Sequence, residues 1–529
     1  MTWRHYLLLA VLGLAMASLV AIFQPAPGYM DADYYYAGGL QLLNGHGFNE
    51  PFLWNYLDDP SGLPHPSNAY WMPFASLVAA AGAFIFGSGS WLAARIGFLV
   101  VAAAIPPLTA ALAWSFTYRR ALALTSGLLA VFSGFYLPFL PVTDTFGLYM
   151  LLGGLFFWLV TRSLSHTTGN SLLVSSFLLG IIAGLMHLSR AEGLLWLLIA
   201  LAAVLFVFPK MQPRRYYFVF CFSFLVLVGY MLVMVPWFLR NISAFGTPLA
   251  PGGSKTLWLT SYNQLFTYPA SQLTFASWWH SGLSAILEAR LWALGLNLAS
   301  AVSVQGEVFL FPLIGIGVWH LRKDHCVQLA LLVWLLTLGA MTVAFPYAGA
   351  RGGFFHSGAA LQPVWWALAP VGLERVIDWA ARKRHWSVIR AGQIFRPTLV
   401  GLAMLLTVVV VGGRVMGGNG GQAWGQENAA YSQIDKYLVS VGMTAEDVVV
   451  VANPPGFYLA SGNPAIAVPD GNIDTLLAVA RRFGASYLVL EGGSVPTGLS
   501  AAYDHPQEQP DLIYLGQIGS AHVFLIRSS

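Results

Sequence analysis

Long apolar runs separated by short polar segments fill most of the chain up to residue 414. A helix needs about 20 mostly apolar residues to cross the hydrocarbon core of a membrane, and the runs have roughly that length. The pattern therefore predicts an α-helical polytopic membrane protein. The candidate runs are Tyr6–Phe23, Met72–Gly87, Trp91–Phe116, Ala121–Pro141, Phe146–Val160, Leu172–Leu188, Leu194–Phe208, Tyr216–Trp237, Val302–Trp319, Val327–Phe345, Ala359–Leu373 and Thr398–Gly412.

The basic residues test which runs cross the membrane, because Lys and Arg in short loops collect on the cytoplasmic side. If Met72–Gly87 is a re-entrant or interfacial helix, fifteen of the 26 Lys and Arg residues fall on one side. A full span there would place Arg119 and Arg120 outside instead. We therefore expect about eleven transmembrane helices in an inner or plasma membrane, with the N-terminus cytoplasmic. The residues assigned to the cytoplasm are Arg4, Arg119, Arg120, Arg162, Lys210, Arg214, Arg215, Arg322, Lys323, Arg375, Arg382, Lys383, Arg384, Arg390 and Arg396.

The pattern changes after Arg414. The glycine-rich stretch 417–421 is typical of a flexible linker, and short apolar strands then alternate with an amphipathic helix over Ile473–Phe483. We expect a transmembrane domain (1–414) with a first outer loop (24–90) and a long outer loop (242–300), a linker (415–424) and a small extracytoplasmic α/β domain (425–529). The predicted strands are Asp447–Ala452, Ala465–Val468, Tyr487–Leu490, Leu512–Leu515 and His522–Ile526, with a turn at 453–456.

Composition supports this class of protein. Hydrophobic residues make up 57% of the chain, charged residues only 9%, and the mean hydropathy is +0.65, which excludes a soluble protein. The net charge of +4 comes mostly from clusters between runs, so it indicates orientation and not nucleic-acid binding. Cys221 and Cys326 indicate neither a disulfide framework nor a metal site.

The first outer loop is acidic. It carries Asp31, Asp33, Glu50, Asp58 and Asp59, and no Lys or Arg lies between Phe23 and Ser90. In an extended segment residues two apart share a face, so Asp31 and Asp33 would converge on one proton or one cation, which makes both of them candidate catalytic residues. Alternatively, Asp33 is the N-cap of a helix over Tyr34–Leu43, whereas no cap is left for Asp31 to make.

Polar residues at the outer ends of the predicted spans give further candidates. Basic residues there oppose the positive-inside rule, and a bound anion would explain them. Each has an alternative: Arg190 pairs with Glu192, Arg240 snorkels from its helix end, and Asp144 caps a helix. The candidate substrate-binding residues are Tyr35, His65, Asp144, Arg190, Arg240, Arg351 and His356, and the candidate metal ligands are Asp31, Asp33, His46 and Glu50.

An acidic pair directly after the first span, followed by Tyr, a short helix, Gly and a basic residue with Pro, resembles a known pattern. The chain resembles the polytopic glycosyltransferases of the GT-C class, which use lipid-linked sugars, and in particular protein O-mannosyltransferases and lipid A aminoarabinose transferases. Those enzymes have an Asp-Glu pair and a Lys-Pro-Pro or His-Pro-Pro stretch, where this chain has Asp31-Ala32 and His65-Pro66-Ser67. The Asp-x-Asp spacing is also similar to that of metal-dependent oligosaccharyltransferases.

This resemblance implies a membrane glycosyltransferase with a GT-C-like fold. It implies inverting transfer of a sugar from a polyprenyl phosphate donor to a lipid, glycan or protein acceptor at the outer membrane face. Asp31 would be the general base, and His65, Arg190, Arg240, Arg351 and His356 would be candidate partners of the phosphate. A divalent cation is a candidate cofactor. The alternative class is a multi-spanning lipid or saccharide transporter or flippase, although the internal repeats common in transporters are not visible here.

Overall fold

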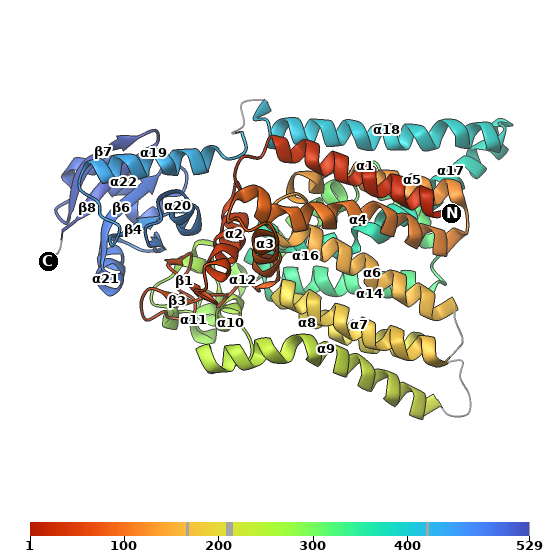
Figure 1. The fold of residues 1–529 in the computed structure, drawn as a ribbon, viewed down its shortest axis with the longest axis horizontal. Helices are drawn as coiled ribbons and strands as arrows, with labels where there is room; N and C mark the ends of the chain where they lie inside the picture. The colour runs from red at the N-terminus through yellow and green to blue at the C-terminus, as the bar shows by residue number, and fades with distance from the viewer. Residues whose placement is uncertain (166–168, 208–214, 419–422, 528–529) are drawn as a thin grey trace. The chain divides into compact units, whose positions relative to one another are not determined.

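Two units make up the computed structural model, which describes residues 1–165, 169–207, 215–418 and 423–527. The helical unit consists of Met1–Phe23, Arg95–Ile242 and Arg290–Gln422. The α/β unit consists of Gln24–Ala94, Ser243–Ala289 and Ala423–Ser529. The first acidic loop therefore belongs to the same unit as the C-terminal segment, although about 400 residues separate the two in sequence (Figure 1).

Long helices form the helical unit, and some of them continue into the α/β unit (Figure 1). A helix satisfies its backbone hydrogen bonds internally, which is what a segment in hydrocarbon requires. The helices are α1 (Trp3–Ile22), α4 (Trp91–Thr117), α5 (Arg120–Val131), α6 (Thr145–Ser165), α7 (Gly169–Ser189), α8 (Leu194–Val207), α9 (Arg215–Phe245), α12 (Leu283–Ser300), α13 (Phe311–His320), α14 (His325–Gly339), α15 (Pro346–Ala348), α16 (Phe354–Gly358), α17 (Gln362–Arg384) and α18 (Val388–Arg414).

Among the described residues, eight helices are long and apolar enough to cross a membrane. The chain is therefore an integral membrane protein, as its hydropathy predicts. Shorter apolar helices lie at Phe74–Ile85, Arg120–Val131, Ala191–Val204 and Phe311–His320. The first of these has 12 residues and rises only about 18 Å, too little for a full span. The number of spans, eleven, stays a prediction, and Lys210 and Arg214 of the topology count lie outside the described residues.

Glycines bring pairs of these helices into close contact. Where α13 crosses α17, a Cβ atom at Gly372 would lie 1.9 Å from the carbonyl oxygen of Leu313, and one at Gly317 would lie 2.3 Å from that of Leu368. Where α7 meets α9, a Cβ atom at Gly180 would lie 2.1 Å from the carbonyl oxygen of Val226. Small residues at such crossings let two backbones approach, which is how helices commonly pack in membranes.

A mixed sheet with the strand order β2-β5-β4-β6-β8-β7 forms the core of the α/β unit. Strands β2, β5, β4 and β6 are parallel, and β8 and β7 are antiparallel to their neighbours. A separate antiparallel pair joins β1 and β3. The strands are β1 (Asn49–Glu50), β2 (Phe52–Leu53), β3 (His65–Pro66), β4 (Val448–Val451), β5 (Ala465–Ala467), β6 (Ala485–Glu491), β7 (Leu512–Ile518) and β8 (Ala521–Ile526).

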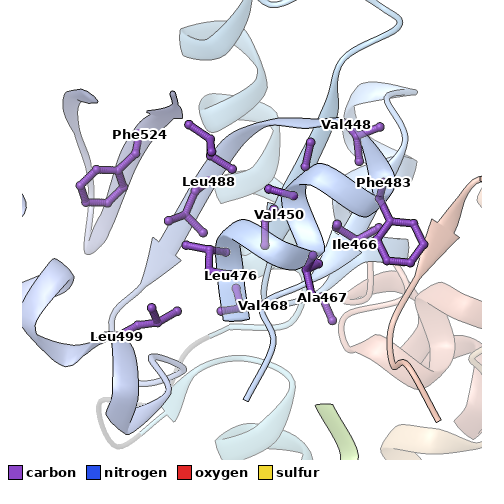
Figure 2. Close-up of a cluster of buried hydrophobic side chains, with 14 of the residues drawn as sticks. Val448, Val450, Ile466, Ala467, Val468, Leu476, Phe483, Leu488, Leu499 and Phe524 are labelled. Atoms are coloured by element: carbon purple, nitrogen blue, oxygen red, sulfur yellow. The ribbon is translucent and has the colours of Figure 1, made fainter. Parts of the chain in front are cut away.

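Helices cover the sheet on both faces because side chains alternate along each strand. Val448 and Val450 of β4 belong to one buried cluster together with Leu476 of α21, and Figure 2 shows this cluster. Val449 and Val451 belong to the opposite cluster. The helices of this unit are α2 (Met30–Leu43), α3 (Phe74–Ile85), α10 (Pro251–Lys255), α11 (Phe275–His280), α19 (Gln426–Ser440), α20 (Pro454–Ser461), α21 (Ile473–Phe483) and α22 (Ser500–Asp504).

The structure confirms each predicted C-terminal strand and the helix Ile473–Phe483. Two local predictions are wrong. Residues 453–456 do not form an isolated turn, because Asn453 caps α20 by accepting a hydrogen bond from the backbone N–H of Gly456. Asp31 and Asp33 do not lie in an extended segment, because α2 begins at Met30 and includes both.

Candidate functional site

The first turn of α2 carries both aspartates of the acidic loop. Residues two apart on a helix point in different directions, so the two carboxyl groups do not share a face. Asp31 is partly exposed, whereas Asp33 is fully buried. The N-terminal turn of a helix favours carboxylates, which accounts for the acidic start of α2. Asp33 is not the N-cap, because Tyr29 occupies that position.

Two asparagine amides hold the buried carboxyl of Asp33. The Nδ2 of Asn453 donates to Oδ2 at 2.9 Å, and the Nδ2 of Asn428 donates to Oδ1 at 3.0 Å. Burial raises the pKa of Asp33 to about 7, although the two amide hydrogen bonds oppose that shift. These contacts tie the start of α2 to α19 and α20 within the α/β unit. The geometry suits a group that positions α2 better than one that meets a substrate.

The same buried network continues to two glutamates. The Nδ2 of Asn453 also donates to Glu427 at 2.7 Å, and the hydroxyl of Tyr431 donates to Glu491 at 2.9 Å. Burial raises the pKa of Glu427 and raises that of Glu491 to about 7. Three carboxyl groups thus share one buried environment without an arginine or lysine partner among the described ion pairs. Burial without a cationic partner favours the protonated form of each of these groups.

The other candidates of the first loop are engaged inside the α/β unit. His65 contacts Asp58 through Nε2 at 2.9 Å, and its Nδ1 lies 2.7 Å from the carbonyl oxygen of Pro66. Both ring nitrogens therefore have protein partners. Tyr35 is buried, and its ring packs against those of Tyr34 and Trp71.

The candidate metal ligands of this loop do not come together. Among the described residues, Asp31, Asp33, His46 and Glu50 form no cluster with the spacing of metal ligands. Both carboxyl oxygens of Asp33 already accept hydrogen bonds from the side-chain amides of Asn428 and Asn453. His46 is exposed and contacts Gln41 through Nδ1. Glu50 is buried in β1, where its backbone lies opposite that of His65 in β3.

In the helical unit, a buried Asp144 contacts a partly buried His356. Asp144 precedes α6, and its Oδ1 accepts a hydrogen bond from the backbone N–H of Thr145. Its Oδ2 lies 3.3 Å from Nε2 of His356. The His356 ring stacks on Phe146, with ring centroids 3.8 Å apart, and its Nδ1 faces the carbonyl oxygen of Gly352. Asp144 thus accepts a hydrogen bond at the start of α6 and contacts the imidazole of His356, and its role in substrate binding stays a prediction.

A second polar group in this unit contains Arg190, Glu192 and Ser357. The Nε of Arg190 donates to Oε1 of Glu192, so the expected ion pair is present. The hydroxyl of Ser357 donates to the same oxygen at 2.6 Å. Ser357 follows His356 directly in α16, so this helix contacts both polar groups.

Arg240 and Arg351 occupy different settings. The Arg240 guanidinium lies over the Trp237 ring, 4.9 Å from its centroid, and donates to the side-chain oxygen of Asn241 at 3.1 Å. Arg351 is exposed and lies in a π-helical segment interrupted at Gly352, where φ is +126°. Only glycine adopts that backbone geometry without strain.

Sequence reasoning missed Arg95. Its Nε donates to the carbonyl oxygen of Pro141 at 2.9 Å, and its Nη1 donates to that of Ala21 at 3.0 Å. The side chain therefore joins the end of α1 to the segment that precedes Asp144. An isolated arginine at the start of an apolar run was the available signal, but a sequence does not show which carbonyl groups it reaches.

Comparison of the sequence finds no matching protein family, and no curated protein matches either. Solved structures do match. The Archaeoglobus fulgidus oligosaccharyltransferase, tethered with an acceptor peptide containing the NVT sequon, has a TM-score of 0.60 at 14% identity, covering 93% of this chain and 69% of that one. AglB from the same organism, in complex with an inhibitory peptide and a dolichol-phosphate, has a TM-score of 0.59 at 13% identity, covering 92% and 70%.

ArnT from Cupriavidus metallidurans, bound to undecaprenyl phosphate, has a TM-score of 0.55 at 13% identity, covering 98% of this chain and 97% of that one. The match thus extends over nearly the whole of both chains. The chain therefore shares the fold of these solved structures, which is the GT-C-like fold that the sequence resemblance implies. A further structure of the A. fulgidus enzyme is a complex with Zn and sulfate.

Proposed function

We propose that this chain is a glycosyltransferase that moves a sugar from a polyprenyl-phosphate-linked donor to an acceptor at the outer membrane face. The observation that carries the proposal is the likeness in fold to ArnT bound to undecaprenyl phosphate and to AglB bound to a dolichol-phosphate. Asp31 supports it, because this partly exposed carboxyl lies on the first turn of a helix shortly after the first span.

In the proposed reaction Asp31 accepts the proton of the acceptor hydroxyl. The hydroxyl oxygen attacks the anomeric carbon from the face opposite the phosphate, the bond between that carbon and the phosphate oxygen breaks, and polyprenyl phosphate leaves. The configuration is inverted, and Asp31 then returns its proton to water. General-base catalysis of this kind contributes roughly a hundredfold to ten-thousandfold in rate.

The departing phosphate needs positive charge or hydrogen-bond donors. We assign this role first to Arg351, because it is exposed and its glycine-rich segment allows close backbone approach. Arg190 already shares its charge with Glu192, and Arg240 with an aromatic ring, so their contributions are expected to be smaller. Asp144 and His356 offer one oxygen and one nitrogen ligand for a divalent cation, which makes metal dependence a measurable part of the proposal.

The test is sugar transfer by the purified full-length protein in liposomes, with a radiolabelled polyprenyl-phosphate sugar and a membrane extract as acceptor source. Asp31→Asn should remain folded but lose at least a hundredfold in rate, because an amide keeps the shape and cannot accept the proton. Asp474→Asn is the matched control, since Asp474 is also an aspartate in the first turn of a helix, α21, and is exposed.

Near-normal transfer by Asp31→Asn would refute the role of Asp31. Movement of the labelled lipid across the bilayer without a new glycosidic bond would instead support a flippase. Chelation of divalent ions followed by their return measures the metal dependence in the same assay.

A further inference from the structure

A cavity lies in the helical unit, at the end where α1 begins and α4 and α6 end. Its volume is about 550 Å³, in the range of cavities that hold small organic groups. Aromatic side chains form much of its wall: Tyr6 from α1, Trp114 and Tyr118 from α4, and Trp158 from α6. Arg162, near the end of α6, is the charged residue among the lining residues that the structure describes.

The polar groups that this cavity offers are donors. Arg162 lies against the Trp158 ring, 5.4 Å from its centroid, and it has no ion pair or hydrogen bond with any described residue. Within the same described ranges, the indole N–H groups of Trp114 and Trp158 and the hydroxyl of Tyr6 also lack hydrogen-bond partners. The Ser115 hydroxyl, by contrast, already donates to the carbonyl oxygen of Leu112 at 2.7 Å. A ligand that matches this lining is rich in acceptor oxygens and carries negative charge.

The aromatic lining and its surroundings indicate where in the membrane such a ligand lies. Trp and Tyr gather at the level of the lipid headgroups, and basic pockets between transmembrane helices bind anionic headgroups. Arg4 and Arg120 begin α1 and α5 near this cavity's helices and are exposed, while Arg119 is paired with Glu374 at 2.7 Å. The local charge is therefore positive.

We propose that this cavity binds the headgroup of an anionic glycerophospholipid, with the phosphate on Arg162 and the glycerol ester region among the aromatic rings. A phosphodiester carries one negative charge, which one guanidinium matches. A polyprenyl monophosphate carries close to two, and Arg162 is its one lining cation in the described chain. A zwitterionic headgroup would bring an ammonium group to a lining without a described carboxylate. This inference does not depend on the proposed glycosyl transfer.

The experiment is native mass spectrometry of the full-length protein, delipidated in detergent and titrated with phosphatidylglycerol or with phosphatidylcholine of the same chains. Wild type should retain phosphatidylglycerol in preference to phosphatidylcholine. Arg162→Gln should weaken phosphatidylglycerol binding roughly tenfold or more, because a charge-assisted contact is lost. Arg322→Gln is the matched control, since Arg322 also lies over a tryptophan ring, that of Trp319, but does not line the cavity.

A second variant tests the cavity without changing its charge. Ala111 lines the cavity, and Ala111→Phe should fill part of it and also reduce retention. Equal loss in Arg162→Gln and Arg322→Gln, or equal binding of the two lipids by wild type, would overturn the proposal. So would displacement of phosphatidylglycerol by equimolar undecaprenyl phosphate, because the cavity would then be a site for the monoester.

Discussion

Replacement of Asp33 gives the sharpest test of the buried network in the α/β unit. The wild-type carboxyl accepts hydrogen bonds from both Asn428 and Asn453. Asparagine at this position has one acceptor oxygen, which can keep the bond from Asn453. Its amide would then face Asn428, whose own Oδ1 is buried without a hydrogen-bond partner among the described residues, so rotation of the Asn428 amide restores a bond.

Asn453 has no such freedom. Its Oδ1 accepts from the backbone N–H of Gly456, and its Nδ2 serves Asp33 and Glu427 together. Asp33→Asn should therefore cost only about 1 kcal/mol where the wild-type group is protonated. Asp33→Ala leaves the Asn428 amide without an acceptor and leaves the Asn453 amide with Glu427 alone, and it should cost about 3 kcal/mol at the same pH.

The pH dependence of Asp33→Asn has a definite sign. The ordinary pKa of the side chain is 3.8, and in the folded protein it is raised to about 7. Well below pH 3.8 both the folded and unfolded chains hold the proton, so the contribution to stability is complete. It is lost as pH rises towards 7, because the unfolded chain ionises first. Between pH 5 and pH 7 the loss is roughly 3 kcal/mol at 1.36 kcal/mol per pKa unit.

Asp33→Asn lacks that ionisation, so its stability should depend less on pH than that of wild type. The variant should be slightly less stable than wild type at pH 4, where most of the wild-type contribution is still present, and more stable than wild type at pH 8. Glu427 and Glu491 remain in both proteins and add a slope of the same sign, so the informative quantity is the difference between the two proteins.

The assay is thermal unfolding of the full-length protein in detergent, at a fixed scan rate because unfolding of such proteins is often irreversible. Proteolysis of the C-terminal segment during the melt reports on the α/β unit. Asp474→Asn, at an exposed helix start, should keep the wild-type slope. If Asp33→Asn kept the full slope, or if Asp33→Ala melted like wild type at pH 5, the network would not stabilise this unit.

Two further outcomes test the helical unit and the topology. Gly372→Ala should lower the melting temperature and cost about 2 kcal/mol of stability, because its Cβ would press on the backbone of α13. Gly401→Ala is the control, since a Cβ there has open space and should change little. Equal effects of the two substitutions would contradict the close crossing. Cysteines introduced at Arg120 and Asp474 should be labelled from opposite sides of the membrane, cytoplasmic for 120 and extracytoplasmic for 474, and labelling from one side would refute the proposed topology.

Sequence patterns carried much of the fold. The helix Ile473–Phe483 was predictable because its apolar residues recur with the helical period. The strands around it were predictable because they are short apolar runs, of which β4 consists entirely of β-branched valines. Strand β2 was not, since two residues, Phe52 and Leu53, carry no periodic signal. Its pairing with β5 joins segments about 400 residues apart, which only tertiary packing specifies.

The wrong prediction of a turn at 453–456 came from a sequence signal that fits two structures. Asn453 followed by two prolines suits a turn and equally suits the start of a helix, because proline fits the first helical positions as well as a turn. For the candidate site, the Arg190–Glu192 pair was one of two alternatives that the sequence left open, because the two residues lie only two positions apart. The contacts of Asp33 with Asn428 and Asn453 were not, because neither asparagine has a distinctive sequence setting.

The two aspartates of α2 illustrate how one short motif supports two different roles. Helical geometry turns Asp33 into the interior of the α/β unit, where the amides of Asn428 and Asn453 fix it, and leaves Asp31 partly exposed two residues earlier on the turn. Fixing one aspartate restricts the other, since both belong to the same rigid turn. A general base must be held in place to accept a proton efficiently. Loss of Asp33 contacts should therefore reduce transfer through misplacement of Asp31, and Asp33→Asn, which keeps the contacts, should retain more activity than Asp33→Ala.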